Sequence, residues 1–163
     1  MVNYCFARYL CNIICKMYAK CQVLANLANF SYDPINYKYI RDVGVLDIFL
    51  HVIKNESNLH LLHFAVAGIC NLCFDGVNAE YIITQCGLKP LVALLKTNNI
   101  KIQADTITSL IQLKDYETGT DITNEEVLKI ICDIQKSDDK RLSNLATIFL
   151  QDVCSTNDIQ IIK

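Results

Sequence analysis

Four residues in the middle of the chain have the types and spacing that zinc sites and redox centres use. Cys70 and Cys73 form a C-x-x-C pair, and His60 and His63 form an H-x-x-H pair just before it. Cysteine thiolates and imidazole nitrogens are the usual zinc ligands, and a C-x-x-C pair can also cycle between dithiol and disulfide. The chemistry that these spacings would support is metal binding or redox catalysis.

The helix that must carry both pairs argues against that chemistry. The sequence predicts one continuous helix over 59–73, in which His63 and Cys70 are about 10 Å apart along the axis, whereas zinc holds its ligands at about 2.0–2.3 Å. A redox pair needs a helix N-terminus, where the dipole lowers the thiol pKa, but this pair lies at the predicted C-terminal end. We interpret both cysteines as structural.

No other arrangement in the sequence points to catalysis. The three histidines all fall between residues 51 and 63, and no serine, threonine or cysteine has a histidine and an acid at a recognisable spacing. A glycine-rich phosphate loop is also missing from the sequence. We therefore expect no enzyme activity, no cofactor, no metal and no small-molecule substrate.

The composition favours a helical protein with a sizeable core. The 163 residues are 52% hydrophobic with a mean hydropathy of +0.25, and they include only five glycines, two prolines and no tryptophan. Few turn-forming residues favour long helices over many short strands. Nine cysteines, an odd number at irregular spacing, predict reduced and buried thiols in an intracellular protein.

The charge balance limits the classes of partner. Fifteen lysines and arginines against 17 acidic residues give a net charge of -2, which does not favour direct sequence-specific nucleic-acid binding. The first twenty residues are apolar, but Arg8, Lys16 and Lys20 interrupt them. We expect neither a signal peptide nor a membrane anchor.

The chain repeats itself about every 42 residues. The stretch LANLANF recurs as AGICNLCF, which aligns Asn29 with Asn71. A third copy, SLIQLKD, contributes Gln112, and a weaker fourth, FLQDVC, contributes Asp152. A period of this length without strand-like alternation predicts an all-α, armadillo-type right-handed α-solenoid of three to four repeats.

Helix start and stop signals divide each repeat into a short helix, a second helix and a long third helix. Asp33 before Pro34 is an N-cap with proline at the first helical position, and Thr123 with Glu126 forms a capping box. The expected helices cover 34–41, 45–54, 59–73, 78–84, 88–96, 100–114, a segment ending at 134, and 141–153. We predict a single domain over 1–163, with repeats at about 1–33, 34–75, 76–115 and 116–154 and a tail at 155–163.

The third helices should line a concave groove with one face. Residues three, four and seven before each repeated polar residue share its face. From these faces we predict the partner-binding residues Asn26, Asn29, Phe64, Gly68, Asn71, Asp105 and Gln112; Gln22, Ala25, Ala67, Thr108 and Ser109 complete the same faces. The flanking residues Leu27, Phe30, Ile69, Leu72, Leu110 and Leu113 should face the core.

A row of amides over small residues would let another chain approach closely and pair its backbone with the side chains. The alternative for each amide is a cap or bridge within the solenoid. Recurrence at a fixed phase favours binding. The fourth copy places Leu145, Ile148 and Phe149 at these positions, where they either anchor a partner or are covered by the tail residues Ile159, Ile161 and Ile162.

Three blocks of sequence carry a family resemblance: VLANLANFSYDPINYKYIRDVGVLDIFL at 23–50, GICNLCFDGVNAEYI at 68–82 and NLATIFLQDVCS at 144–155. Over about 22–155 the chain resembles the armadillo repeat-containing protein 7 family. The resemblance implies a non-enzymatic nuclear adaptor of the minor, U12-type spliceosome. Such an adaptor would support pre-mRNA splicing by contact with a protein that carries an RNA-recognition motif.

The alternative is a general peptide-binding or nuclear-transport-type armadillo adaptor. Armadillo import receptors use a tryptophan four residues before the groove asparagine, and here those positions hold Ala25, Ala67 and Thr108. The missing tryptophan disfavours recognition of basic signals by stacking.

Overall fold

The computed structural model describes residues 2–116 and 121–153, with side chains from Lys16 onward. Within these residues the chain forms α-helices, two short 3-10 helices and no strand. The elements are α1 (Val2–Phe30), η1 (Pro34–Asn36), α2 (Tyr37–Asp42), α3 (Val45–Asn55), α4 (Leu59–Leu72), α5 (Gly76–Thr84), α6 (Leu88–Leu94), α7 (Ile100–Leu113), η2 (Lys114–Tyr116), α8 (Glu125–Gln135) and α9 (Lys140–Val153).

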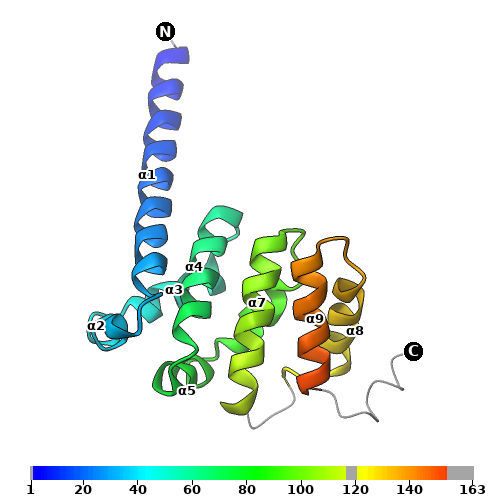
Figure 1. Ribbon diagram of the computed structural model, residues 1–163. Coiled ribbons are helices and arrows are strands. Elements are labelled where there is room, and N and C mark those ends of the chain that lie inside the picture. Colours follow the sequence, from blue (N-terminus) through cyan, green and yellow to red (C-terminus); the bar gives the residue numbers. More distant parts are fainter. Residues whose placement is uncertain (1, 117–120, 154–163) are drawn as a thin grey trace.

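The long helices stack in one layer. Helix α4 packs between α1 and α7, and α7 packs in turn against α9, so that the four follow one another across the molecule (Figure 1). A second layer lies behind them, with α3 against α4, α6 against α7 and α8 against α9. This arrangement confirms the predicted all-α solenoid.

Side-chain caps set most helix starts. The Asp33 carboxylate accepts a hydrogen bond from the Ile35 N–H, with Pro34 at the first position as predicted, but the expected helix over 34–41 is split into η1 and α2. The Asn58 side chain accepts from two backbone N–H groups at the start of α4, and Asn99 does the same for α7. Such caps satisfy donors that have no partner within the helix.

Helix α9 begins one residue earlier than expected, at Lys140, and the starts of α5 and α8 differ through their caps. Helix α5 begins at Gly76, because the Asp75 side chain accepts from the Asn78 N–H at 3.0 Å and so caps the helix two residues early. Helix α8 uses Asn124 and not Thr123 as its N-cap, with the Asn124 amide oxygen 3.0 Å from the Val127 nitrogen. An N-cap oxygen accepts from the N–H two or three residues ahead, and at the start of α8 the Asn124 oxygen does so.

The core side of the third helices is as predicted in the second and third copies. Ile69, Leu72, Leu110 and Leu113 are fully buried. In the first copy Leu27 is partly buried, and Phe30 is 48% exposed, which makes the expectation for Phe30 wrong. The reason is that, in the described part of the chain, no helix packs behind α1 as α3 packs behind α4.

This open face of α1 leaves apolar surface uncovered. Val23, at the position equivalent to the buried Ala65 of α4, is 56% exposed. Between α1 and α3 lies a groove of about 540 Å³, lined in part by Ala19, Val23 and Ile48. Each other long helix has a partner on this face.

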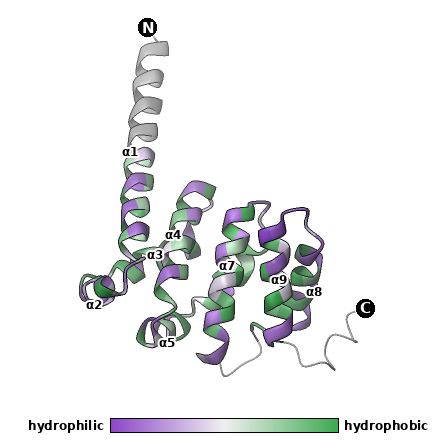
Figure 2. Cartoon of the chain, in the orientation of Figure 1, coloured by the Kyte–Doolittle hydropathy of each residue, from purple (hydrophilic) through white to green (hydrophobic). Residues whose placement is uncertain are grey.

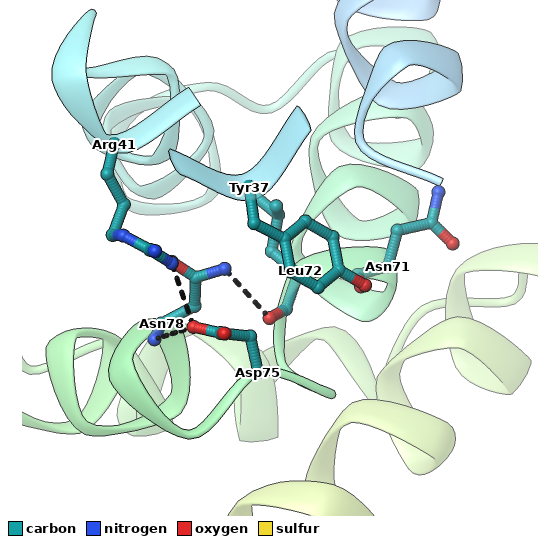
Figure 3. A network of polar contacts seen from close by, with 6 residues as sticks. All are labelled: Tyr37, Arg41, Asn71, Leu72, Asp75 and Asn78. Carbon is teal, nitrogen blue, oxygen red and sulfur yellow. Dashed lines mark hydrogen bonds and ion pairs between the residues drawn. The ribbon is translucent and has the colours of Figure 1, made fainter. Parts of the chain in front are cut away.

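A polar network joins the first short helix to the next repeat (Figure 3). The Arg41 guanidinium donates to Asp75 at 2.8 Å and to the Asn78 amide oxygen at 3.0 Å. The buried Asn78 amide in turn donates to the Leu72 carbonyl at 3.2 Å. The network therefore fixes α2 against the turn between α4 and α5.

Candidate partner-binding surface

The concave surface is formed by the exposed sides of α1, α4, α7 and α9. Positions four and seven residues before the repeated polar residue are partly or fully exposed in every copy. They are Gln22, Ala25, Phe64, Ala67, Asp105, Thr108, Leu145 and Ile148. The predicted binding residues Phe64 and Asp105 therefore lie on this surface.

The position three residues before the polar residue does not belong to the surface. Gly68 is buried, and a β-carbon built on it would lie 2.3 Å from the Phe49 ring of α3. Ser109 and Phe149, at the same position of the next copies, are also fully buried. The predictions of Gly68, Ser109 and Phe149 as groove residues are wrong, because this position faces the helix of the second layer.

Asn26 shows that this position is buried only where a helix of the second layer packs against it. It occupies the position of Gly68 in the first copy, yet it is exposed, since nothing in the described part of the chain packs behind α1. Its side chain accepts a hydrogen bond from the Gln22 amide at 3.1 Å, one turn earlier on the helix. Asn26 therefore lies at the border of the concave surface, next to Gln22 and toward the open face of α1.

An apolar hollow lies between α1 and α4 on the concave surface. It has a volume of about 340 Å³, and Phe64 of α4 faces Met17, Cys21 and Ala25 of α1 across it. Tyr18, Gln22 and His60 complete the lining, and Tyr18 is 71% exposed. We name this feature the Phe64 hollow. The predicted row of amides suggested a polar groove, whereas this hollow is apolar. Met17 and Tyr18 were not predicted to line it, because the repeat pattern in the sequence begins after them.

The three predicted amides at the repeated polar position divide into one that is hydrogen-bonded across repeats and two that are not. The Asn71 side chain donates to the Ala28 carbonyl at 3.0 Å, and the Asn71 carbonyl accepts from the Tyr37 hydroxyl at 2.9 Å. Ala28 is in the last turn of α1, where carbonyls have no partner within the helix. Asn29 is exposed and Gln112 half-buried, and neither side chain is hydrogen-bonded within the described residues. Asn71 thus bridges repeats, while Asn29 and Gln112 stay free to contact a partner.

Asp105 gives the middle of the surface its main charged pair. Its side chain is 17% exposed and lies 3.7 Å from the Arg141 guanidinium of α9. Burial raises the pKa of the Asp105 carboxyl, and the positive charges of His63, Arg141 and Lys101 oppose that rise. On α4, burial lowers the pKa of His63. The charged pair on this surface therefore joins α7 and α9.

The cysteine pair lies inside the protein. Cys70 and Cys73 are buried at the C-terminal end of α4, in agreement with the structural interpretation. Burial raises the pKa of Cys70 to about 12 and that of Cys73 further. In the described ranges, no three histidine, cysteine, aspartate or glutamate side chains are grouped so as to hold a metal. The expectation of buried cysteines is wrong for Cys86, which is exposed.

We expect thiol alkylation to separate these cysteines. At pH 8 a thiol with a pKa of about 12 is ionised to roughly one part in ten thousand, so Cys70 should stay unmodified while exposed Cys86 reacts. Raising the pH to 9 should not change the order, because both values lie far below that pKa. Sequential labelling with light and heavy iodoacetamide, before and after denaturation, measures each site by mass spectrometry. Modification of native Cys70 as fast as Cys86 would contradict the structure.

No helix in the part of the chain that the structure describes is both long and apolar enough to cross a membrane. The stacked long helices, with a second layer behind them and a concave side lined by side chains from successive repeats, define an armadillo-type repeat scaffold. Solved structures support this class. An engineered protein matches with a TM-score of 0.72 at 16% identity, and a designed armadillo repeat protein in complex with the peptide (KR)4 matches with a TM-score of 0.63 at 14% identity.

Both alignments cover 87% of this chain and 60% of the solved one, so the chain spans about three fifths of the length of those structures. No protein-family model matches the sequence. A curated relative, armadillo repeat-containing protein 7 of Mus musculus, is 39% identical over 143 residues, which covers 86% of this chain and 72% of the relative. The chain belongs to the armadillo repeat-containing protein 7 family.

Proposed function

We propose that the chain is a protein-binding adaptor of the minor, U12-type spliceosome that works in the nucleus. It would act in pre-mRNA splicing without catalysis, by holding a protein partner that carries an RNA-recognition motif. Membership of the family, at 39% identity over 143 residues, is the observation that carries this proposal. The net charge of -2 agrees with contact to RNA through the partner rather than by the chain itself.

The concave surface supplies what such contact needs. The Phe64 hollow accepts an apolar side chain of the partner, because its lining is apolar and it opens to solvent between two helices. Asn29 on α1 and Gln112 on α7 offer amides that can pair with a backbone, and Asp105 with Arg141 offers charge. An apolar anchor with polar groups around it is the usual composition of a protein interface.

Affinity purification tests the adaptor function. The tagged full chain is incubated with nuclear extract with and without RNase, and captured proteins are identified by mass spectrometry. We expect capture of a protein with an RNA-recognition motif that survives RNase. Capture of unrelated cargo without splicing factors would overturn the minor-spliceosome proposal and favour a general peptide-binding or nuclear-transport-type adaptor.

Variants locate the contact in the same experiment. Tyr18→Ala and Phe64→Ala, which remove two walls of the Phe64 hollow, should each reduce capture by roughly tenfold, the loss typical of an interface anchor. Ile48→Ala, on α3 in the second layer, is a control that removes an apolar side chain outside the Phe64 hollow, with an exposed fraction of 45%, below that of Tyr18. Asn29→Ala should weaken capture without changing helicity, whereas Asn71→Ala should mainly lower stability. Full capture by both hollow variants would move the contact to another face.

A further inference from the structure

Exposed aromatic side chains recur on the outer edge of the solenoid, away from the concave surface. Tyr32, Phe74 and Tyr116 are each 42 residues apart and follow the ends of α1, α4 and α7. Their exposed fractions are 78%, 59% and 37%. Two more pairs with the same spacing, also exposed, lie beside them: Ile35 with Val77, and Tyr39 with Tyr81. We name these seven residues the edge row.

The edge row is continuous from one repeat to the next. The Tyr116 hydroxyl lies 3.0 Å from the β-carbon position of Gly76 at the start of α5, so the third aromatic residue sits against the helix that follows the second one, Phe74. Arg41 ties α2 to Asp75 and to Asn78 of α5. Figure 1 shows α2 and α5 beneath the ends of the long helices, and Figure 2 shows hydrophobic residues on both. The seven exposed residues of the edge row therefore form one continuous strip.

The backbone of this edge limits what can bind there. It consists of helices and capped turns, whose N–H groups are already bonded, as those of Ile35 and Asn78 are to Asp33 and Asp75. A strand that needs backbone partners would find none. A polyproline II segment needs none, because it has no internal hydrogen bonds and each proline lacks an N–H.

The spacing of the edge row also fits the polyproline II conformation. Packed helices lie about 8–10 Å apart, so equivalent residues of successive repeats are separated by about that distance. A polyproline II helix advances about 9.3 Å in each three-residue turn. One face of such a segment therefore meets one aromatic ring per turn, as in the aromatic-lined grooves that bind proline-rich segments.

The charge around the edge row indicates which residues a bound proline-rich segment should carry between its prolines. The basic residues of α2 are already paired, Lys38 with Asp42 and Arg41 with Asp75. Within the described residues, the acids next to the edge row, Asp33, Glu80 and Asp115, form no ion pair. This net negative charge favours lysine or arginine in the bound segment, and it disfavours RNA stacked on the same rings.

From these observations we propose that the edge row binds a proline-rich segment of a protein partner that also carries basic residues. The site is distinct from the Phe64 hollow and does not depend on it. Its test uses the purified full chain and a fluorescein-labelled peptide of two Arg-Pro-Pro-Leu-Pro-Pro units, followed by fluorescence anisotropy. Control ligands are the same peptide with every proline replaced by alanine, the peptide with glutamate in place of arginine, and oligouridylate RNA.

We expect saturable binding of the proline peptide, weaker binding of its glutamate version and no binding of the RNA. Tyr32→Ser/Phe74→Ser should weaken binding by about tenfold or more, while Tyr18→Ser in the Phe64 hollow should leave it unchanged. Tyr32→Ser alone, at the most exposed position, keeps the test valid if the double variant loses helicity. Equal binding of the alanine peptide, preferential RNA binding, no saturation, or full affinity in Tyr32→Ser would each overturn the proposal.

Discussion

Substituting Gly68 by valine should lower the free energy of unfolding by about 3 kcal/mol, or roughly 9 °C in Tm for a protein of this size. The β-carbon position of Gly68 is 2.3–2.8 Å from three atoms of the Phe49 ring, and that ring is fully buried. In a close-packed core the ring cannot move aside without disturbing its other neighbours. The close approach of α3 to α4 therefore requires glycine, although glycine weakens a helix interior.

Urea unfolding followed by circular dichroism measures this loss. Ala67→Val is the matched control, because it adds valine at the adjacent position of α4, which is partly exposed on the concave side. It should cost only about 0.5 kcal/mol of helix propensity. Phe49→Leu should partly rescue Gly68→Val, with a coupling energy of about 1 kcal/mol or more. Equal effects of the two valine substitutions would show that Gly68 is not packed against Phe49.

Replacing Asn78 by alanine should cost about 3 kcal/mol, although the residue lies on a short helix far from the concave surface. The fully buried amide accepts from Arg41 at 3.0 Å and donates to the Leu72 carbonyl at 3.2 Å. Its removal takes one of two hydrogen bonds from the Leu72 carbonyl, which keeps the Asp75 N–H at 3.2 Å, and leaves the Arg41 guanidinium with Asp75 alone. The expected result is a lower urea midpoint, with α2 loosened from the turn between α4 and α5.

A double-mutant cycle with Arg41→Ala separates this network from simple loss of packing. Since Arg41 and Asn78 act on each other directly, the double variant should lose clearly less stability than the two single variants together. Glu80→Ala, an exposed change on the same helix, should alter stability by less than about 0.5 kcal/mol. Additive losses from Arg41→Ala and Asn78→Ala would contradict the coupling.

The repeat period was enough to predict the fold, three of the long helices and the core positions of the second and third copies. It aligned Asn29 with Asn71, and this phase placed Ile69 and Leu110 correctly in the interior. What it could not provide was the width of the concave face. With 3.6 residues per turn, the position three residues before the asparagine lies about 60° around the helix, against about 40° and about 20° for the positions four and seven before it.

That difference decides whether a side chain is exposed or buried. Gly68 falls beyond the edge of the concave face and packs against Phe49, whereas Phe64 stays within it. Periodicity alone does not say where the second layer of helices lies, so the limit is set by tertiary packing. The exposure of Phe30 and the position of Asn26 beside the open face of α1 were unpredictable for a related reason, because both depend on a neighbour that the described part of the chain does not supply to α1.

The function of single amides depended on the same tertiary information. In the sequence, Asn29 and Asn71 are equivalent, and both were predicted to bind a partner. In the structure, Asn71 has a carbonyl of the previous repeat within reach, at 3.0 Å, whereas Asn29 has none, because no described helix precedes α1 in the layer. Asn29 and Asn71 are equivalent in the repeat, but their places in the array of helices give them different hydrogen-bond partners.

The open face of α1 determines which helix should unfold first. Helix α4 is held by α1, α3 and α7, whereas α1 packs mainly on α4. In a linear array of repeats, stability is the sum of each unit and its contacts with its neighbours, so a unit with one neighbour is the first to open. Backbone amides of α1 should therefore exchange with deuterium before those of α4, and fraying should spread inward from α1 as denaturant is added.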